Sequence, residues 1–595
     1  MAAIILPFLS TLVIPGLLLS LVFIKKEEID LLFFLIHSVI FGIAFAIISA
    51  FLLPFIGDSI LPGLIFSLAV VIFLLRSKIN LVKIKFSVYD WAIIFISIIL
   101  LFFINNHLRQ LGIDYFNPAT DQYYWLAYGE RSAHDSRLAL HFLTTASIDR
   151  GSFFLIISHY TNLLPKNLDA YQNFILFWIF FNYFILSLTI GRLALIILPV
   201  RSLAILAPVA VFSLHWFNYY LLSTAVVPQN LGLFLFMAGF IFLNEKTTPA
   251  FTALYLIIFY LVHLATLTMF VLIVGSSKIF KEAIALITRK KESWHNFEKV
   301  SFLPAVIVAI LYVLYLFNFL EFYNPNLISY YEDYSKNWNL WSQPYIGFKQ
   351  NMIIWSGIVG SFLAVLGSVF YKKLSPAALP LAFALLMPWL YLTSSIIAYH
   401  AFYASWQPFR YFLIMYPAIA ILALFSISAV FLLIKKFISE ELGIAIIFIV
   451  MIILTPVFLT EAHRQQSFIF LDMIKGRDEG VINLEKRKNL ENLLAFNKSL
   501  PKNRDNPVLN FSAPFDLPYL QWIFSPRTVL LNYKECSRRS CVLQEPLLPK
   551  SYDFFNLQSE LAIVGEIAEG SLVEKEVLYD KFSVRKELGS FAVYQ

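Results

Sequence analysis

The sequence carries little charge for its length. Only 14% of its 595 residues are charged, whereas soluble proteins average about 25%. It has only two cysteines, which excludes a disulfide-rich scaffold. The motifs GxxxxGK[ST], HExxH and CxxC are also absent from the sequence. Nothing in it therefore points to P-loop ATP hydrolysis or to zinc-protease chemistry.

What the sequence has in excess is apolar surface. Hydrophobic residues make up 59% of the chain, and 60 residues are phenylalanine. A single soluble core stops growing well below this length, so this surface needs a lipid bilayer as its solvent. The composition predicts an α-helical polytopic membrane protein rather than a soluble enzyme or a disordered chain.

Apolar runs of membrane length recur along the sequence. A spanning helix needs about 20 mostly apolar residues. On this criterion we predict fourteen transmembrane helices, at about 2–24, 31–53, 59–75, 88–104, 173–191, 202–215, 229–243, 250–263, 264–280, 301–319, 351–370, 376–393, 409–434 and 442–459. The short pair 250–263 and 264–280 has an alternative, one long span with a re-entrant turn.

The basic residues orient these helices. If residue 1 lies outside, 19 lysines and arginines fall in the alternate, cytoplasmic loops, and 8 fall in the outer loops before residue 460. The positive-inside rule then predicts that both termini lie outside. The formal net charge of +7 is therefore a signal of topology, and we expect a bilayer but no nucleic acid as a partner.

Two domains are predicted. Residues 1–459 form the transmembrane domain, with large outer loops at 105–171 and 321–350. Residues 460–595 have the composition of a small extracytoplasmic α/β or α+β domain. Their pattern predicts the following elements: helix at 461–500, strands at 508–511 and 528–531, a helix at 517–523, and a hairpin turning near Gly589. Cys536 and Cys541 lie in this domain, either as a disulfide or as two free thiols.

The first outer loop has the most informative pattern. Asp114 and Asp121 follow the fourth predicted helix, and a helical spacing places Asp121, Tyr124, Trp125 and Tyr128 on one face. Aromatic faces stack on sugar rings, and they also anchor proteins at the membrane interface. The two carboxylates therefore belong either to a sugar-handling site or to a solvated loop.

Two stretches resemble a known family. TDQYYWLAYGERS in the first outer loop and WQPFRYFLIMYPAIAILA at 406–423 are similar to the GT-C superfamily of polytopic membrane glycosyltransferases. Members move a sugar from a polyprenyl-phosphate carrier to an acceptor on the outer face. The paired acid of many members is Asp121-Gln122 here, and three further helices precede the loop. The resemblance covers about residue 88 to the end.

The resemblance implies an inverting transferase. Asp121 is then the general base that activates the acceptor hydroxyl, and Asp114 is the alternative. Arg410 is expected to hold the leaving phosphate through its bidentate guanidinium, or else to anchor its helix at the interface. The implied partners are a polyprenyl-phosphate sugar and a glycan, lipid or protein acceptor, at the plasma membrane of a prokaryote.

Other polar residues give weaker signals. Asp121, His134 and Asp135 are possible ligands of a divalent metal such as Mg²⁺ or Mn²⁺, although their spacing fits no specific site and ordinary surface positions are the alternative. His263 is either a contact for the donor phosphate or an interface histidine. His37 lies in an apolar helix and is expected to face the bundle interior.

The loop 321–350 is rich in aromatic residues. It holds seven tyrosines and tryptophans, including Trp338 and Trp341. Some of them fit an interfacial belt, and together they also suit a lid over a sugar or a lipid carrier.

Three other functions remain open. His400 and Arg410 suit a polymerase or ligase of lipid-linked glycans. A transporter of lipid-linked sugars would fit fourteen helices, but we find no internal repeat and few mid-membrane charges. The third is a non-catalytic assembly or anchoring protein. An oligosaccharyltransferase is disfavoured because the WWDYG signature is absent from the sequence.

Overall fold

The structure is a computed structural model. The residues that it describes are 2–24, 28–56, 60–76, 83–111, 121–144, 151–161, 163–214, 217, 227–245, 247–288, 296–316, 348–370, 374–393, 409–435, 439–475, 484–500, 508–510, 517–525, 529–531, 561–564, 585–588 and 591–594.

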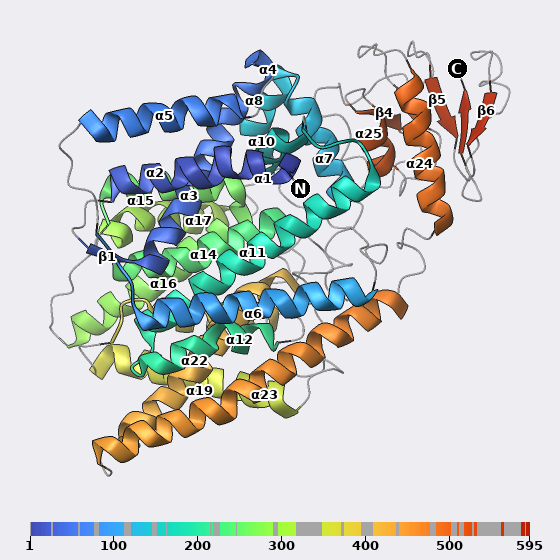
Figure 1. The fold of residues 1–595 in the computed structure, drawn as a ribbon. Helices are drawn as coiled ribbons and strands as arrows, with labels where there is room; N and C mark the ends of the chain where they lie inside the picture. Colours follow the sequence, from blue (N-terminus) through green and yellow to red (C-terminus); the bar gives the residue numbers. More distant parts are fainter. Residues whose placement is uncertain are drawn as a thin grey trace.

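The chain folds as a helical bundle with a small sheet beyond one end (Figure 1). Its first elements are α1 (Ala2–Pro7), the π-helix η1 (Phe8–Val13), α2 (Ile14–Phe23), β1 (Glu28–Asp30), α3 (Leu31–Ala50), α4 (Leu53–Ile56), α5 (Leu61–Arg76), β2 (Lys83–Lys85) and α6 (Val88–Leu111). The next are α7 (Asp121–Ser132), α8 (Ser136–Thr144), α10 (Gly151–Thr161), α11 (Leu168–Ile197), the 3₁₀-helix η3 (Arg201–Leu206) and α12 (Ala207–Phe212).

The helices described in the second half of the bundle have 14 to 36 residues. They are α14 (Val227–Asn244), α15 (Pro249–Val262), α16 (Leu264–Ile287), α17 (Asn296–Leu316), α19 (Phe348–Phe370), α20 (Ala378–Thr393), α22 (Phe409–Lys435) and α23 (Glu440–Lys475). Each of the fourteen predicted segments meets helical structure. α23 runs unbroken through the predicted domain boundary at residue 459.

The helices confirm the coarse prediction of a helical membrane protein. Among the described residues, six helices are long and apolar enough to cross a membrane: Ala3–Phe23, Leu31–Ala50, Val88–Asn106, Leu168–Ile197, Leu413–Ile434 and Glu441–Arg464. Further apolar helices are shorter, with 10–17 residues. The count of fourteen spans stays a prediction.

The C-terminal elements form a mixed sheet flanked by two helices. They are α24 (Leu484–Ser499), β3 (Val508–Asn510), α25 (Leu517–Phe524), β4 (Val529–Leu531), β5 (Leu561–Val564), β6 (Arg585–Leu588) and β7 (Phe591–Tyr594). The order of the five described strands is β4-β3-β5-β7-β6. β3 pairs in parallel with β4 and β5, and the antiparallel pair β6–β7 is the hairpin predicted near Gly589. No strand was predicted at the position of β5.

Glycines allow two N-terminal helices to pack closely. A methyl group at Gly16 on α2 would overlap the carbonyl oxygen of Ser38 on α3, and one at Gly42 on α3 would overlap that of Leu12 in η1, which leads directly into α2. Small residues that let backbones approach are a general device of helix packing in membranes. The backbones of these helices therefore touch directly.

The segments 250–263 and 264–280 form a helical hairpin. α15 and α16 are separated only by His263, whose backbone is extended. The ring centroids of Tyr255 and Phe270 lie 6.5 Å apart, whereas 15 residues of straight helix would separate them by about 22 Å. The two helices therefore fold back on each other, a geometry that both predicted arrangements share.

Polar contacts collect at the end of the bundle that carries β1. β1 pairs in parallel with β2, and Lys85 forms an ion pair with Glu28. Arg192 contacts Asp30 at 2.6 Å and Glu245 at 3.4 Å. Figure 1 shows α7, α25 and the five-stranded sheet near the opposite end. The first four segments predicted to be cytoplasmic thus lie together, away from α7.

Candidate functional site

The predicted outer loop 105–171 is largely helical. α6 extends to Leu111, and α7, α8 and α10 precede α11. α7 begins at Asp121, the residue from which the predicted helical face starts. Asp114 lies outside the described residues, and so do the side chains of Asp121 and Tyr124.

The aromatic face of α7 packs against α10. Trp125 and Tyr128 are 3% and 1% exposed. The ring centroid of Trp125 lies 5.3 Å from that of Phe153, and the centroid of Tyr128 lies 5.5 Å from that of Phe154. These two rings therefore hold α7 on the bundle and have no free face for a sugar.

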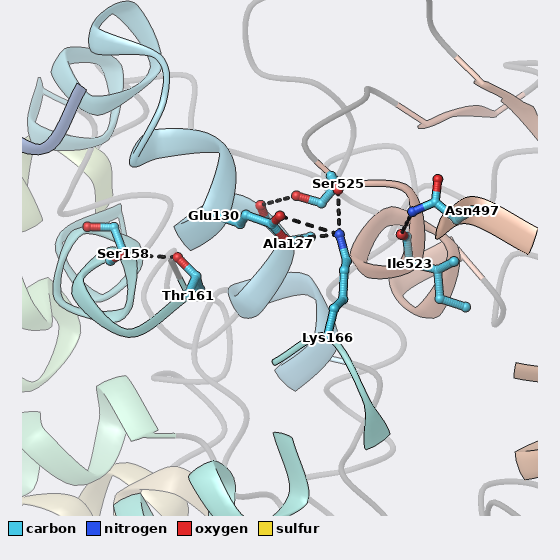
Figure 2. Close-up of polar contacts among 8 residues, drawn as sticks. All are labelled: Ala127, Glu130, Ser158, Thr161, Lys166, Asn497, Ile523 and Ser525. Atoms are coloured by element: carbon cyan, nitrogen blue, oxygen red, sulfur yellow. Dashed lines mark hydrogen bonds and ion pairs between the residues drawn. The ribbon is translucent and has the colours of Figure 1, made fainter. Parts of the chain in front are cut away.

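A charged junction lies at the other end of α7 (Figure 2). Lys166, just before α11, has its ammonium 3.2 Å from a carboxylate oxygen of Glu130 on α7. The same ammonium donates a hydrogen bond to the backbone carbonyl of Ser525, which follows α25. The Lys166 and Glu130 side chains are only 20% and 16% exposed. One cation therefore joins α7, the start of α11 and the C-terminal segment.

The junction satisfies the carbonyl end of α25. The last carbonyl groups of a helix have no partner within the helix, and cations are favoured there. The amide Nδ2 of Asn497 on α24 donates to the carbonyl of Ile523 at 2.6 Å, while Lys166 reaches that of Ser525. The Ser525 hydroxyl donates to the carbonyl of Ala127 on α7 at 3.4 Å. Figure 2 shows these contacts meeting around the end of α25.

Burial and the neighbouring carboxylate act on Lys166 in opposite directions. Burial is the larger effect and lowers the pKa of the ammonium, while Glu130 raises it. Burying an ion costs free energy that only well-placed partners offset. The carboxylate of Glu130 and the carbonyl of Ser525 are those partners here.

An aromatic contact brings α25 against α11 as well. The rings of Tyr171 and Trp522 meet edge to face, with centroids 4.5 Å apart, and both side chains are buried. α25 therefore rests on α7 and α11 together.

Two of the possible metal ligands, His134 and Asp135, are described in the structure. Oδ1 of Asp135 accepts hydrogen bonds from the backbone N–H groups of Arg137 at 2.8 Å and Leu138 at 3.4 Å. This is the geometry of a helix N-cap, at the start of α8. His134 is exposed. Among the described residues no group of three or more His, Cys, Asp or Glu side chains is placed to hold a metal ion.

His263 caps a helix. Its Nδ1 accepts a hydrogen bond from the backbone N–H of Thr266 at 3.3 Å and lies 2.6 Å from the Thr266 hydroxyl. The side chain is 7% exposed, because Gly232 on α14 approaches it closely. His37 is also buried, stacked on Phe251 with centroids 4.5 Å apart. The prediction that His37 faces the bundle interior is confirmed.

Several other residues singled out in the sequence are not described, or are described only in their backbone. Trp338, Trp341, His400, Cys536 and Cys541 lie outside the described residues, and so does the side chain of Arg410. Arg410 is the second residue of α22, so the position of its backbone is known.

α22 packs closely along α19. Gly357 and Gly360 on α19 lie against the carbonyl oxygens of Ile419 and Leu422 on α22, in the same order along both helices. α19 and α22 therefore run in the same direction. The end of the aromatic loop 321–350 and the segment with Arg410 thus enter the bundle at one end.

No pattern in the sequence pointed to the Lys166 junction, because Lys166 meets Ser525 across 359 positions. The sequence predicted a helix at 517–523, which is α25. Long-range pairing of this kind leaves no local pattern.

The described contacts outline one candidate site. Its parts are a helix that begins at Asp121, the aromatic face that holds this helix on α10, and the charged junction with α25. No family model matches the chain, and no curated protein matches it.

Proposed function

We propose that the chain is a membrane glycosyltransferase that moves a sugar from a polyprenyl-phosphate carrier to an acceptor on the outer face of the membrane, with Asp121 as general base. The observation that carries the proposal is the position of α7. It begins at Asp121, follows the long apolar helix α6 and precedes the long apolar helix α11 in the sequence, and packs against α10 through buried aromatic rings. The resemblance of its sequence to GT-C enzymes supports the same interpretation.

The proposed reaction is a direct displacement. The Asp121 carboxylate takes the proton of an acceptor hydroxyl, and the oxygen attacks the anomeric carbon of the sugar. The bond from that carbon to the phosphate oxygen breaks, and polyprenyl phosphate leaves with the bonding electrons. The anomeric centre is inverted, and the sugar is now bound to the acceptor.

The leaving phosphate needs a positive partner. Arg410 near the start of α22 is our candidate, because a guanidinium binds phosphate through two parallel hydrogen bonds. α19, which follows the aromatic loop with Trp338 and Trp341 in the sequence, begins at the same end of the bundle as α22, and we propose that this loop is a lid. A divalent ion such as Mg²⁺ would be an additional partner for the phosphate.

One rival shares most of this chemistry. A polymerase or ligase of lipid-linked glycans would depend on His400 and Arg410 rather than on Asp121. A transporter or an anchoring protein would depend on none of these residues for a bond-forming step.

The test is a transfer assay with purified protein. Radiolabelled polyprenyl-phosphate sugars are incubated with the wild type, Asp121→Asn and Asp114→Asn. We expect Asp121→Asn to lose at least about 100-fold in transfer or hydrolysis, the lower end of the range for loss of a general base. Full activity in both variants contradicts the proposal.

The matched control is Asp169→Asn. Asp169 is an exposed carboxylate on the first turn of α11, and its loss should leave the rate unchanged. Loss of activity in His400→Ala with normal activity in Asp121→Asn favours the polymerase or ligase.

A further inference from the structure

We infer that Lys166 is a positioning residue, which couples the docking of the C-terminal segment through α25 to the placement of the helix that begins at Asp121. The catalytic consequence rests on the proposed function. The coupling itself rests only on the contacts between α7, α11 and α25.

The first step is the reach of Lys166. Its ammonium contacts Glu130 on α7 and the carbonyl of Ser525 on the C-terminal segment. Its own backbone is next to Asn167, whose side chain caps α11 by accepting a hydrogen bond from Ala170 at 2.8 Å. The position of Lys166 is therefore fixed by a long apolar helix, and it ties two other elements to that helix.

The second step is the rigidity of α7. Glu130 follows Asp121 by nine residues in one unbroken helix, a distance of about 13 Å along the axis. α10 holds one side of α7 through Trp125 and Tyr128. α25 supplies a second side through Ser525, whose hydroxyl donates to Ala127. Because α7 is one unbroken helix, a shift or rotation of its Glu130 end also moves Asp121 at its start. The contacts on two sides restrain that movement.

The third step is the cost of undocking. If α25 moved away, the carbonyl of Ser525 would lose its donor, and the ammonium of Lys166 would keep only its contact with Glu130. The end of α25 is held from its own side by Asn497, so the C-terminal segment moves with it. Lys166 is therefore the charged contact through which α25 and α7 hold each other in place.

The experiment measures the distance between the two parts in the full-length protein. Spin labels are placed on cysteines at Arg137 on α8 and Lys488 on α24, both exposed, with Cys536 and Cys541 replaced by serine. We expect a single narrow distance distribution in the wild type. Lys166→Met should broaden it, and a distribution as narrow as that of the wild type overturns the inference.

A double variant separates coupling from the effect of leaving the Glu130 carboxylate without the charge of Lys166. Glu130→Leu combined with Lys166→Met removes that carboxylate. If Lys166→Met alone fails to fold, the double variant provides the test in its place. Coupling predicts a broad distribution in the double variant, because the Ser525 carbonyl still lacks its donor. Recovery of the narrow distribution overturns the inference. Lys498→Met, at an exposed position on α24, is the matched control and should leave the distribution narrow.

The transfer assay tests the catalytic consequence of the coupling. In Lys166→Met we expect kcat to fall about 10-fold to 100-fold, the size of effect that a displaced catalytic group produces, with KM unchanged. Unchanged kcat beside a broadened distribution overturns the positioning role. If the wild type has no transfer activity, the proposed function fails, and the distance measurements alone decide the coupling.

Discussion

The guanidinium of Arg192 lies 2.6 Å from a carboxylate oxygen of Asp30. Asp30 belongs to the first loop that the charge pattern assigns to the cytoplasm, and Arg192 to the third. Glu245, 3.4 Å from the same guanidinium nitrogen, comes from the fourth. The contact therefore joins three segments that the positive-inside rule had grouped on one side without knowledge of the fold.

This grouping predicts how the protein is oriented. In a variant without Cys536 and Cys541, a cysteine at Arg137 on α8 should react with a membrane-impermeant maleimide in intact cells. A cysteine at Arg76, at the end of α5, should react only after the membrane is permeabilised. Both positions are exposed, so accessibility within the fold does not separate them. Labelling of Arg76→Cys in intact cells would reverse the predicted orientation.

Asp135 provides a test of helix capping against metal binding. Its carboxylate accepts two backbone hydrogen bonds at the start of α8. Asp135→Ala should therefore lower stability by about 1 kcal/mol, whereas Asp135→Ser, which also caps, should lower it little. Thermal unfolding in detergent measures both. Normal stability with loss of a metal-dependent activity in Asp135→Ser would instead favour a ligand role.

Much of the helical framework could be predicted because it depends on local composition. A run of apolar residues as long as Leu168–Ile197 leaves the chain few alternatives to a helix, and its ends have local causes. Asn167 caps the start. Pro199 restricts the residue before it, Leu198, to the extended conformation seen there.

The contacts of the site could not be predicted in the same way. Trp125 was placed on the correct helical face, but the sequence does not say whether that face meets a sugar or Phe153. The same holds for His263, which lies at a helix end as expected and caps α16. The meeting of Lys166 with Ser525 depends on tertiary packing alone.

His263 can be tested for its two possible roles. The structure assigns it the cap of α16, so His263→Ala should destabilise the protein by about 1 kcal/mol. Asparagine also caps helices well, so His263→Asn should keep both the thermal midpoint and the transfer rate. A normal midpoint with reduced transfer in His263→Asn would show that the imidazole binds the donor.

Gly42 should tolerate no side chain. A methyl group there overlaps the backbone carbonyl of Leu12, which has no freedom to move aside. Gly42→Ala should therefore cost at least about 1–3 kcal/mol, as overpacked cores do. The control is Gly367→Ala on α19, where the new methyl group would lie 3.2 Å from the flexible end of Leu374. Equal thermal midpoints for the two variants would contradict the direct backbone contact of η1 and α3.

The lowered pKa of Lys166 predicts a dependence of stability on pH. Burial is the main cause of the shift below the ordinary value of 10.5. Between the lowered value and 10.5, the folded protein has released a proton that the unfolded chain still binds. Because the unfolded chain then binds more protons, the free energy of unfolding rises with pH across this interval.

Lys166→Met removes this contribution, so the thermal midpoint of the wild type should rise relative to that of the variant as the pH approaches 10.5. Thermal unfolding at a series of pH values measures the difference. Lys498→Met, at an exposed lysine, should follow the wild type. Parallel curves for the wild type and Lys166→Met would mean that the ammonium of Lys166 is as well solvated in the folded protein as in the unfolded chain.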